Sequence, residues 1–249
     1  MQRLTILILL CAAALASDFD PPVGMKFRSP DLKLGPKGAA ILFGASKTQA
    51  AELEARREAF QKLGVDAQTL NGPGSGWFVL DAKGVIVAKY LDGPYTPAAI
   101  LVHQFGWTPP NTTQVESRQL TATIGVSDST AAPGERVALT IDVDLAPNMH
   151  VYAPGVEGYI PIDWKMEASS AAQAHAPVFP RAEKLYLKAI DETVPAFRNH
   201  FRLIRDVTIG AGSAGMLTLS GTLRYQACDD RVCYIPQTLH LNWTLDSRR

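Results

Sequence analysis

The stretch YQACDDRVCYIPQT, residues 225–238, contains Cys228 and Cys233, and the chain has one other cysteine, Cys11. Two bonded cysteines need Cα atoms within about 4.4–6.8 Å of each other. Five steps of extended chain would instead place them about 17 Å apart. If these two cysteines are bonded, the chain must therefore turn back at Asp229-Asp230-Arg231.

The third cysteine falls in an N-terminal segment with the pattern of an export signal. Arg3 precedes the apolar run of residues 4–15, and Ala14-Leu15-Ala16 offers a small-x-small cleavage site. We expect residues 1–16 to be removed as a signal peptide, so that a periplasmic protein begins near Ser17. One close cysteine pair in an oxidising compartment is typical of a disulfide.

Length and composition narrow the class of protein. The 249 residues predict about two modest domains. The 24 basic and 24 acidic residues leave no net charge, which argues against a nucleic-acid partner and against a basic membrane-binding surface. After the signal, no stretch reaches the roughly 18 apolar residues of a spanning helix, so no transmembrane segment is expected in the mature chain. The five histidines are scattered without metal-ligand spacing, so no metal site is predicted.

Residues 37 to about 106 alternate strand and helix patterns. A buried strand is predicted at 39–43, and Ser46-Lys47-Thr48-Gln49 has the capping-box pattern of a helix start. That helix should end at Leu63, before Gly64. Two strands joined by a glycine-containing turn and a last helix complete a βαββα unit, with these elements at 77–80, 85–88 and about 97–104.

This order, with Phe-Val-Leu-Asp-x-x-Gly at residues 78–84, resembles the thioredoxin and peroxiredoxin superfamily. In that superfamily the reactive cysteine lies where the first strand meets the first long helix, because the helix N-terminus lowers the pKa of a thiol. Residues 44–48 contain no cysteine, and the segment between Leu63 and Trp77 is too short for the superfamily's additional strand and helix. The resemblance implies a degenerate, redox-inactive thioredoxin-like domain at residues 17–106, with a structural or docking role.

A polar, proline-rich linker is predicted at residues 107–114, and beyond it apolar residues alternate with a period of two. Short alternating strands separated by turns such as Ala132-Pro133-Gly134-Glu135 favour an antiparallel β-sandwich of the immunoglobulin type. The alternating positions lie at 120–126, 137–145, 160–166, 217–225 and 239–245. The predicted fold class is thus α/β plus all-β, with a partial thioredoxin-like βαββα unit before the sandwich.

The chemistry of the cysteine pair leaves three interpretations open. Closing so small a loop stabilises by only about 2 kcal/mol, against about 5 kcal/mol for a loop of about 100 residues, so a structural crosslink is inefficient here. A polar hairpin tip is accessible to an attacking thiolate, which favours redox exchange. A metal site built on the reduced thiols is the third interpretation. Strand parity groups Cys228 with polar positions such as Thr222 and Gln226, and so predicts that Cys228 is exposed.

The cysteine motif and the strands before it resemble the N-terminal periplasmic domain of the thiol:disulfide interchange protein DsbD, over about residues 115–246. The resemblance implies an immunoglobulin-like domain at residues 115–249. In that family, the two hairpin cysteines accept electrons from the membrane-embedded part of DsbD and pass them to periplasmic oxidoreductases with thioredoxin folds. Since this chain shows no membrane part, we expect its membrane thiol reductase to be a separate protein.

The same resemblance assigns roles to individual residues. Cys233 would bond to the partner protein, and Cys228 would resolve that bond. A cap segment is implied at residues 190–197, with Val194 or Phe197 as the apolar lid over the cysteines. The other residues placed around the site are Asp191, Glu192, His150, Tyr152 and Tyr234.

These expectations describe a thiol:disulfide interchange oxidoreductase that transfers electrons between protein thiols and needs no cofactor. Two alternatives stay open. An immunoglobulin-like binding module would hold an inert structural disulfide, and a copper-handling protein would use the reduced cysteines as soft ligands.

Overall fold

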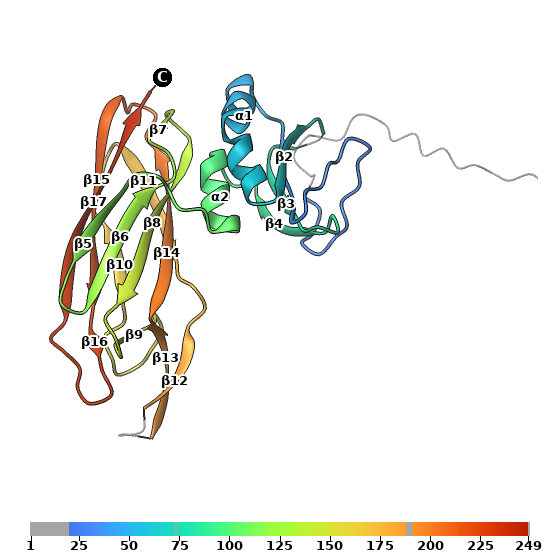
Figure 1. The fold of residues 1–249 in the computed structure, drawn as a ribbon. Coiled ribbons are helices and arrows are strands. Elements are labelled where there is room, and N and C mark those ends of the chain that lie inside the picture. Colours follow the sequence, from blue (N-terminus) through green and yellow to red (C-terminus); the bar gives the residue numbers. More distant parts are fainter. Residues whose placement is uncertain (1–19, 73, 188–190, 249) are drawn as a thin grey trace, which may run out of the picture. The chain divides into compact units, whose positions relative to one another are not determined.

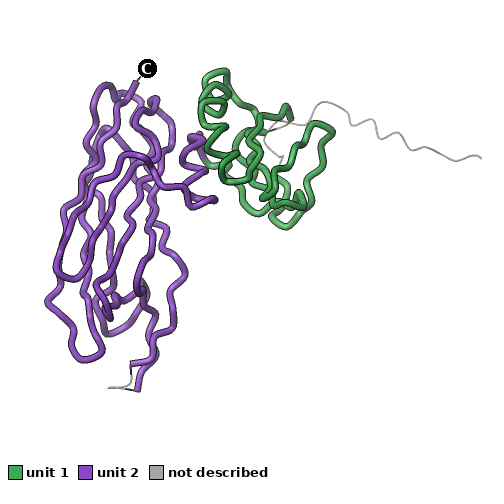
Figure 2. Tube along the Cα trace, viewed as in Figure 1, with its two compact units in different colours: residues 1–92 green, residues 93–249 purple. Residues whose placement is uncertain are grey.

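The computed structural model describes residues 20–72, 74–187 and 191–248. The predicted signal peptide, including Cys11, the predicted first mature residue Ser17, and Ile190 of the predicted cap lie outside the described residues. The chain divides into two compact units, residues 1–92 and 93–249 (Figure 2). No helix in the described part is long and apolar enough to cross a membrane.

The N-terminal unit is a four-stranded sheet with one helix. Its elements are β1 (Gly38–Phe43), α1 (Lys47–Lys62), β2 (Val65–Leu70), β3 (Gly76–Leu80) and β4 (Ile86–Tyr90). The sheet order is β2-β1-β3-β4, with β2 parallel to β1 and with β3 antiparallel to both of its neighbours. This α/β unit contains one strand more than the sequence predicted.

The additional strand is β2, which occupies part of the segment where neither a strand nor a helix was expected. Its own period-two pattern is weak, because only Val65 and Ala67 contribute buried apolar side chains. Pairing with β1 holds it in place, in a parallel register that runs from Gly38↔Val65 to Phe43↔Leu70. The segment between Leu63 and Trp77 was expected to be too short for an additional strand and helix; it does form the strand, but its described residues form no helix.

Helix α1 begins and ends where the sequence predicted. The Ser46 hydroxyl accepts a hydrogen bond from the Gln49 backbone N–H at 3.2 Å, and the Gln49 side-chain oxygen accepts one from the Ser46 N–H at 2.9 Å. These two bonds form the capping box and satisfy two free amides of the first turn. At the other end, Gly64 takes φ 77°, a left-handed conformation that ends the helix.

Helix α2 (Pro97–Phe105) belongs to the second compact unit, whereas the sequence analysis placed it at the end of the first. It packs on β8 (Arg136–Leu145) of the sandwich. Buried polar contacts attach it there, because the Thr96 hydroxyl donates to Asp128 at 2.6 Å and the His103 ring nitrogen lies 2.7 Å from Asp206. The sequence of the helix shows that it is apolar, but it does not show which of the two sheets the helix packs on.

The predicted sandwich is confirmed in the second unit, and its strand pairs are antiparallel except for β17 with β7. One sheet has the order β10-β15-β17-β7, from β10 (Asp163–Met166), β15 (Gly215–Tyr225), β17 (Gln237–Ser247) and β7 (Thr130–Ala131). The other has the order β11-β14-β8-β6-β5, from β11 (Ala172–Val178), β14 (His200–Ile209), β8, β6 (Leu120–Val126) and β5 (Thr112–Glu116). The inward-facing side chains of both sheets form one apolar core, in which the Trp164 and Trp243 rings stack at 5.4 Å. Strand β5 begins inside the predicted linker.

A small third sheet lies at one end of the sandwich, far from the C-terminus in Figure 1. Its order is β12-β13-β9-β16, from β12 (Glu183–Leu187), β13 (Glu192–Arg198), β9 (His150–Tyr152) and β16 (Ala227–Cys228). Most of the predicted cap segment is thus the strand β13, paired with β12 on one side and with β9 on the other. Through β16, this small sheet includes Cys228 and places it in the same sheet as β9 and the β12–β13 hairpin.

Candidate functional site

Cys228 and Cys233 form a disulfide across a tight turn, with Cα atoms 4.0 Å apart. The predicted turn at residues 229–231 is confirmed. The Asp229 carboxylate accepts hydrogen bonds from the backbone N–H groups of Arg231 and Val232, at 2.7 and 2.8 Å. An aspartate that binds backbone amides two and three residues ahead is a local turn former, so this side chain fixes the loop between the two cysteines.

The two cysteines differ in exposure. Cys228 is 1% exposed, whereas Cys233 is an exposed residue. The parity argument, which predicted an exposed Cys228, is therefore wrong. It assumed one continuous strand, but β15 ends at Tyr225 and β16 pairs with β9 in a different sheet. The alternation of faces does not continue across that change of sheet.

Tyr234 braces the cysteine loop. Its hydroxyl donates to Asp229 at 2.9 Å, and its backbone carbonyl accepts from the Gln226 side-chain amide at 3.0 Å. Three hydrogen bonds lower the pKa of Asp229. The largest effect comes from the backbone N–H of Val232, followed by the N–H of Arg231 and the Tyr234 hydroxyl. The same carboxylate raises the pKa of Tyr234. The predicted site residue Tyr234 thus contacts the loop through Asp229.

Strand β9 brings His150 and Tyr152 to the disulfide. His150 is the register partner of Cys228 in the antiparallel β9–β16 pair. The Tyr152 hydroxyl lies 3.7 Å from the Cys233 sulfur. The two rings meet edge to face, with centroids 5.4 Å apart. One face of one strand therefore presents a polar group to each half of the disulfide.

Burial shifts the proton affinities of both rings toward the neutral form. Burial is the main cause that lowers the pKa of His150; the positive charge of Arg198 adds to it, and Asp230 and Asp229 oppose it. Burial is also the main cause that raises the pKa of Tyr152, with a contribution from Glu192. At neutral pH the imidazole is therefore uncharged and the phenol keeps its proton.

The two predicted lid residues lie in different places. Val194 packs with Tyr152 and Cys228 in a small apolar cluster, which Leu185 and Leu187 of β12 complete. Phe197 instead belongs to the main sandwich core, where its ring stacks on Phe201 at 4.8 Å. The structure thus brings Val194 to the disulfide and places Phe197 in the core.

The two predicted acidic residues bind tyrosine hydroxyls. Asp191 accepts a hydrogen bond from Tyr186 at 2.8 Å, and Glu192 accepts one from Tyr159 at 2.7 Å. The second contact raises the pKa of Tyr159 to about 12. Neither Tyr159 nor Tyr186 was predicted as a site residue, although the alternation in Lys184-Leu185-Tyr186-Leu187 is a strand signal.

A cavity of about 420 Å³ lies beside the disulfide. It is lined by both cysteines, His150, Tyr152, Tyr159 and residues 185–187 and 229–232. Both sulfurs, a neutral imidazole and a phenol thus border one space. These are groups that can carry out thiol chemistry and hold protons.

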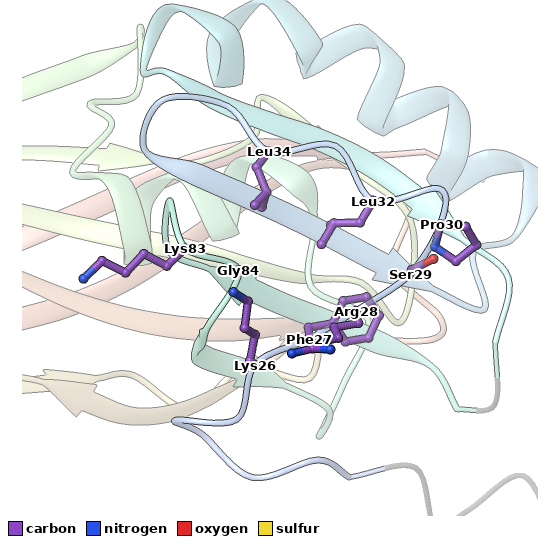
Figure 3. A pocket seen from close by; sticks show the side chains of 9 residues that line it. All are labelled: Lys26, Phe27, Arg28, Ser29, Pro30, Leu32, Leu34, Lys83 and Gly84. Atoms are coloured by element: carbon purple, nitrogen blue, oxygen red, sulfur yellow. The ribbon is translucent and has the colours of Figure 1, made fainter. Parts of the chain in front are cut away.

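The N-terminal unit has a pocket of similar size but of different chemistry. Its volume is about 410 Å³, and its lining includes Lys26, Arg28, Lys83 and Leu34 (Figure 3). Cations and apolar side chains dominate this lining, which includes no cysteine, histidine or carboxylate among the described residues. The groups suited to thiol chemistry are therefore at the disulfide end of the sandwich.

Residues 121–243 match the family model described as thiol:disulfide interchange protein DsbD, N-terminal. Similar solved structures include the reduced DsbD N-terminal domain of Neisseria meningitidis, with 14% identity over 52% of this chain and 88% of that chain and a TM-score of 0.38. The N-terminal periplasmic domain of ScsB from Proteus mirabilis is 19% identical, over 56% of this chain and about half (52%) of that one, with a TM-score of 0.39.

A third similar structure is the complex between the DsbD N-terminal and PilB N-terminal domains of Neisseria meningitidis, with 14% identity, coverage of 49% of this chain and 80% of that chain, and a TM-score of 0.35. No curated protein matches the chain. The matched residues include both cysteines of the hairpin, His150 and Tyr152. Over residues 121–243, the chain is therefore similar to the family of DsbD N-terminal domains.

Proposed function

We propose that this protein exchanges its Cys228–Cys233 disulfide with the thiols of partner proteins in the periplasm. The observation that carries the proposal is the unequal exposure of the two cysteines within a domain that matches the DsbD N-terminal family. An exposed Cys233 can be attacked by a partner thiolate, with Cys228 as the leaving group, and in the reverse direction the buried Cys228 can release a partner from its bond to Cys233. The export signal expected at residues 1–16 supports the periplasmic location.

The exchange balances as a transfer of two electrons. A partner thiolate attacks the Cys233 sulfur, a mixed disulfide forms, and Cys228 leaves as a thiolate. The partner's second thiolate then attacks the partner's own sulfur and releases Cys233 as a thiolate. The partner ends as a disulfide, and this protein takes up two protons as a dithiol. The reverse sequence passes the electrons on to a second protein.

The surface around the exposed sulfur suits a protein partner. Val232, Ile235 and Tyr186 are 54%, 80% and 53% exposed, and Val232 and Tyr186 also line the cavity at the disulfide. Exposed apolar side chains around a reactive group favour contact with another protein surface. The partners that fit are periplasmic oxidoreductases with thioredoxin folds on one side and a separate membrane thiol reductase on the other.

The N-terminal unit has a structural or docking role in this proposal. Its sheet order β2-β1-β3-β4, with the parallel β1-α1-β2 crossover, supports a thioredoxin-like domain. The N-cap of α1 is Ser46, and residues 44–48 contain no cysteine. A thiol at that position would gain from the helix dipole, so its absence leaves the redox chemistry to the sandwich.

Trapping experiments test the function. Cys228→Ser leaves an exposed thiol at Cys233 that can attack a partner disulfide, and the mixed disulfide then persists because no second thiol resolves it. Cys233→Ser leaves only the buried Cys228 thiol and should capture at least tenfold less partner. The measurement is non-reducing electrophoresis and mass spectrometry after expression in the periplasm.

Other outcomes would contradict parts of this proposal. Capture through Cys228 alone would reverse the roles of the two cysteines. Capture through neither, together with a reduction potential below about −300 mV, would indicate an inert structural disulfide. The double variant, with serine at both positions, is the matched control for non-covalent association.

A further inference from the structure

His150 contains a buried nitrogen without a hydrogen-bond partner. The residue is 3% exposed, and its Nε2 accepts or donates no hydrogen bond among the described residues. An unsatisfied buried polar atom costs free energy, so its presence in a folded protein calls for a physical reason. When such an atom lies next to a reactive group, it is a candidate for a hydrogen bond or proton transfer that occurs in another state of the site.

The backbone register places His150 opposite the buried Cys228. His150 and Cys228 are directly opposite each other in the antiparallel β9–β16 pair. Side chains at opposite positions point to the same face, and their Cβ atoms are about 4.5–5.5 Å apart. Both residues line the same cavity. The imidazole is thus the polar group of β9 that lies across from Cys228, while Tyr152 lies against Cys233.

We propose that His150 is the acid-base partner of Cys228, taking the proton of its thiol when Cys228 attacks and returning a proton when the disulfide opens. The inference rests on the proposed exchange function and adds to it the group that generates the resolving thiolate. A disulfide sulfur is a poor hydrogen-bond acceptor, which explains why Nε2 lacks a partner while the bond is closed. Reduction gives the same nitrogen a thiol or thiolate partner.

The proton and electron transfers balance. In the mixed disulfide between Cys233 and a partner, the Cys228 thiol gives its proton to the imidazole. The thiolate attacks the Cys233 sulfur, and the new bond forms as the bond between Cys233 and the partner breaks. The partner sulfur leaves with the electron pair and takes up the proton from the imidazolium. This protein is oxidised and the partner is reduced; the reverse reaction follows the same path backwards.

The charges around the imidazole suit this role. Arg198 of β13, the register partner of His150, disfavours the imidazolium, whereas Asp229 and Asp230 of the cysteine loop favour it. Tyr152 on the same strand keeps its proton and carries no charge. Burial outweighs the two carboxylates, so the imidazole is a neutral base at pH 7. A neutral base next to a thiol is what the resolving step needs.

The test uses the purified, reduced protein and the small disulfide dithiobis-nitrobenzoate, which releases a coloured thiolate at each step. Attack by Cys233 gives a first phase whose rate depends on reagent concentration. Resolution by Cys228 gives a second, concentration-independent phase. His150→Gln keeps a hydrogen-bonding side chain but cannot accept the proton. We expect it to slow the second phase at least tenfold at about pH 7, with the first phase changed less than twofold.

The pH dependence separates this role from a purely structural one. The deficit of His150→Gln should close toward about pH 10, where a thiol ionises without a base. His240→Gln, at an exposed position on β17, is the matched control and should leave both phases unchanged. An unchanged second phase, or a deficit that is the same at every pH, would overturn the inference.

Two further measurements keep the outcome decisive. If His150→Gln does not fold by circular dichroism, the His150 imidazole pKa is measured by NMR in the native disulfide and dithiol states, and equal values would overturn the inference. The small disulfide needs no protein partner. A slowed second phase with no protein captured by Cys228→Ser would therefore uphold the role of His150 and refute the proposed function, and capture with a normal second phase would do the reverse.

Discussion

His150 and Tyr152 lie two residues apart on β9, so their side chains point to the same side of the strand. The disulfide spans that spacing, since Cys228 pairs with His150 and the Cys233 sulfur lies 3.7 Å from the Tyr152 hydroxyl. The two sulfurs therefore have different polar neighbours and different exposure. At the scale of single residues, this asymmetry distinguishes the attacked cysteine from the resolving one.

Tyr152→Phe removes the hydroxyl beside Cys233 and little else. A hydroxyl that donates to a thiolate stabilises it, and hydrogen bonds to a charged group contribute about 1.5–3 kcal/mol. We expect the pKa of the Cys233 thiol in the reduced protein to rise by about 1–2 units in the variant. Thiolate absorbance during a pH titration of Cys228→Ser, with and without Tyr152→Phe, measures this pKa. An unchanged pKa would show that the hydroxyl does not act on the sulfur.

The hairpin of β12 and β13 is the element that borders the site. Val194 and Leu185 are register partners on its two strands, and both contribute to the apolar cluster that contains Tyr152 and Cys228. Three residues further along β13, Phe197 is part of the main core. One strand thus has a residue that packs against Cys228 and another that anchors the strand to the sandwich.

Alanine substitutions should separate these two functions of β13. Phe197→Ala should lower the free energy of unfolding by about 3–5 kcal/mol, since it leaves a cavity in the core. Val194→Ala should cost less stability but should speed attack on the disulfide by a small thiol at least threefold, because it loosens the apolar cluster that packs on Cys228. Urea denaturation and thiol-exchange kinetics measure the two effects. Faster exchange in Phe197→Ala, at a temperature where it is folded, would assign the covering role to Phe197 instead.

The elements that could be predicted are those whose own sequence contains a local pattern of burial or capping. The alternation of buried and exposed side chains in β15 and β17 is visible within each strand, and so is the capping box at Ser46. Strand β2 and the burial of Cys228 could not be predicted, because each depends on a distant partner. Strand β2 depends on pairing with its parallel neighbour β1, and the burial of Cys228 depends on the pairing of β16 with β9.

Only part of the candidate site could be predicted from the sequence. Cys228 and Cys233 follow from their spacing and from the expected compartment. Val194 and Phe197 are both apolar residues of the same short segment, and only the fold shows that Val194 lies at the disulfide and Phe197 in the core. Tyr159 was missed because its partners lie on other elements of the fold: its ring lies 4.3 Å from the Tyr152 ring of β9, and its hydroxyl donates to Glu192, which is 33 residues away on β13.

At the scale of the molecule, the boundary between the compact units lies between Asp92 and Gly93, and not in the predicted linker at 107–114. Helix α2 and the residues just before it bring polar groups into the second unit. The Tyr95 hydroxyl donates to Asp206 at 3.1 Å and accepts from the Arg136 guanidinium at 2.9 Å. The stability of a separately expressed sandwich should therefore depend on whether the fragment begins before or after α2.

Two fragments test this boundary and the division of function between the units. A fragment of residues 93–249 keeps α2, so it should fold and exchange disulfides with a small thiol at the rate of the full chain. A fragment of residues 112–249 lacks α2 and leaves Asp128 and Asp206 without the partners that Thr96 and His103 provide. Each buried group that loses its partner costs about 1–3 kcal/mol, so the shorter fragment should unfold at lower urea concentration. Equal midpoints for the two fragments would show that α2 does not stabilise the sandwich, and slower exchange in the longer one would show that the N-terminal unit takes part in the chemistry.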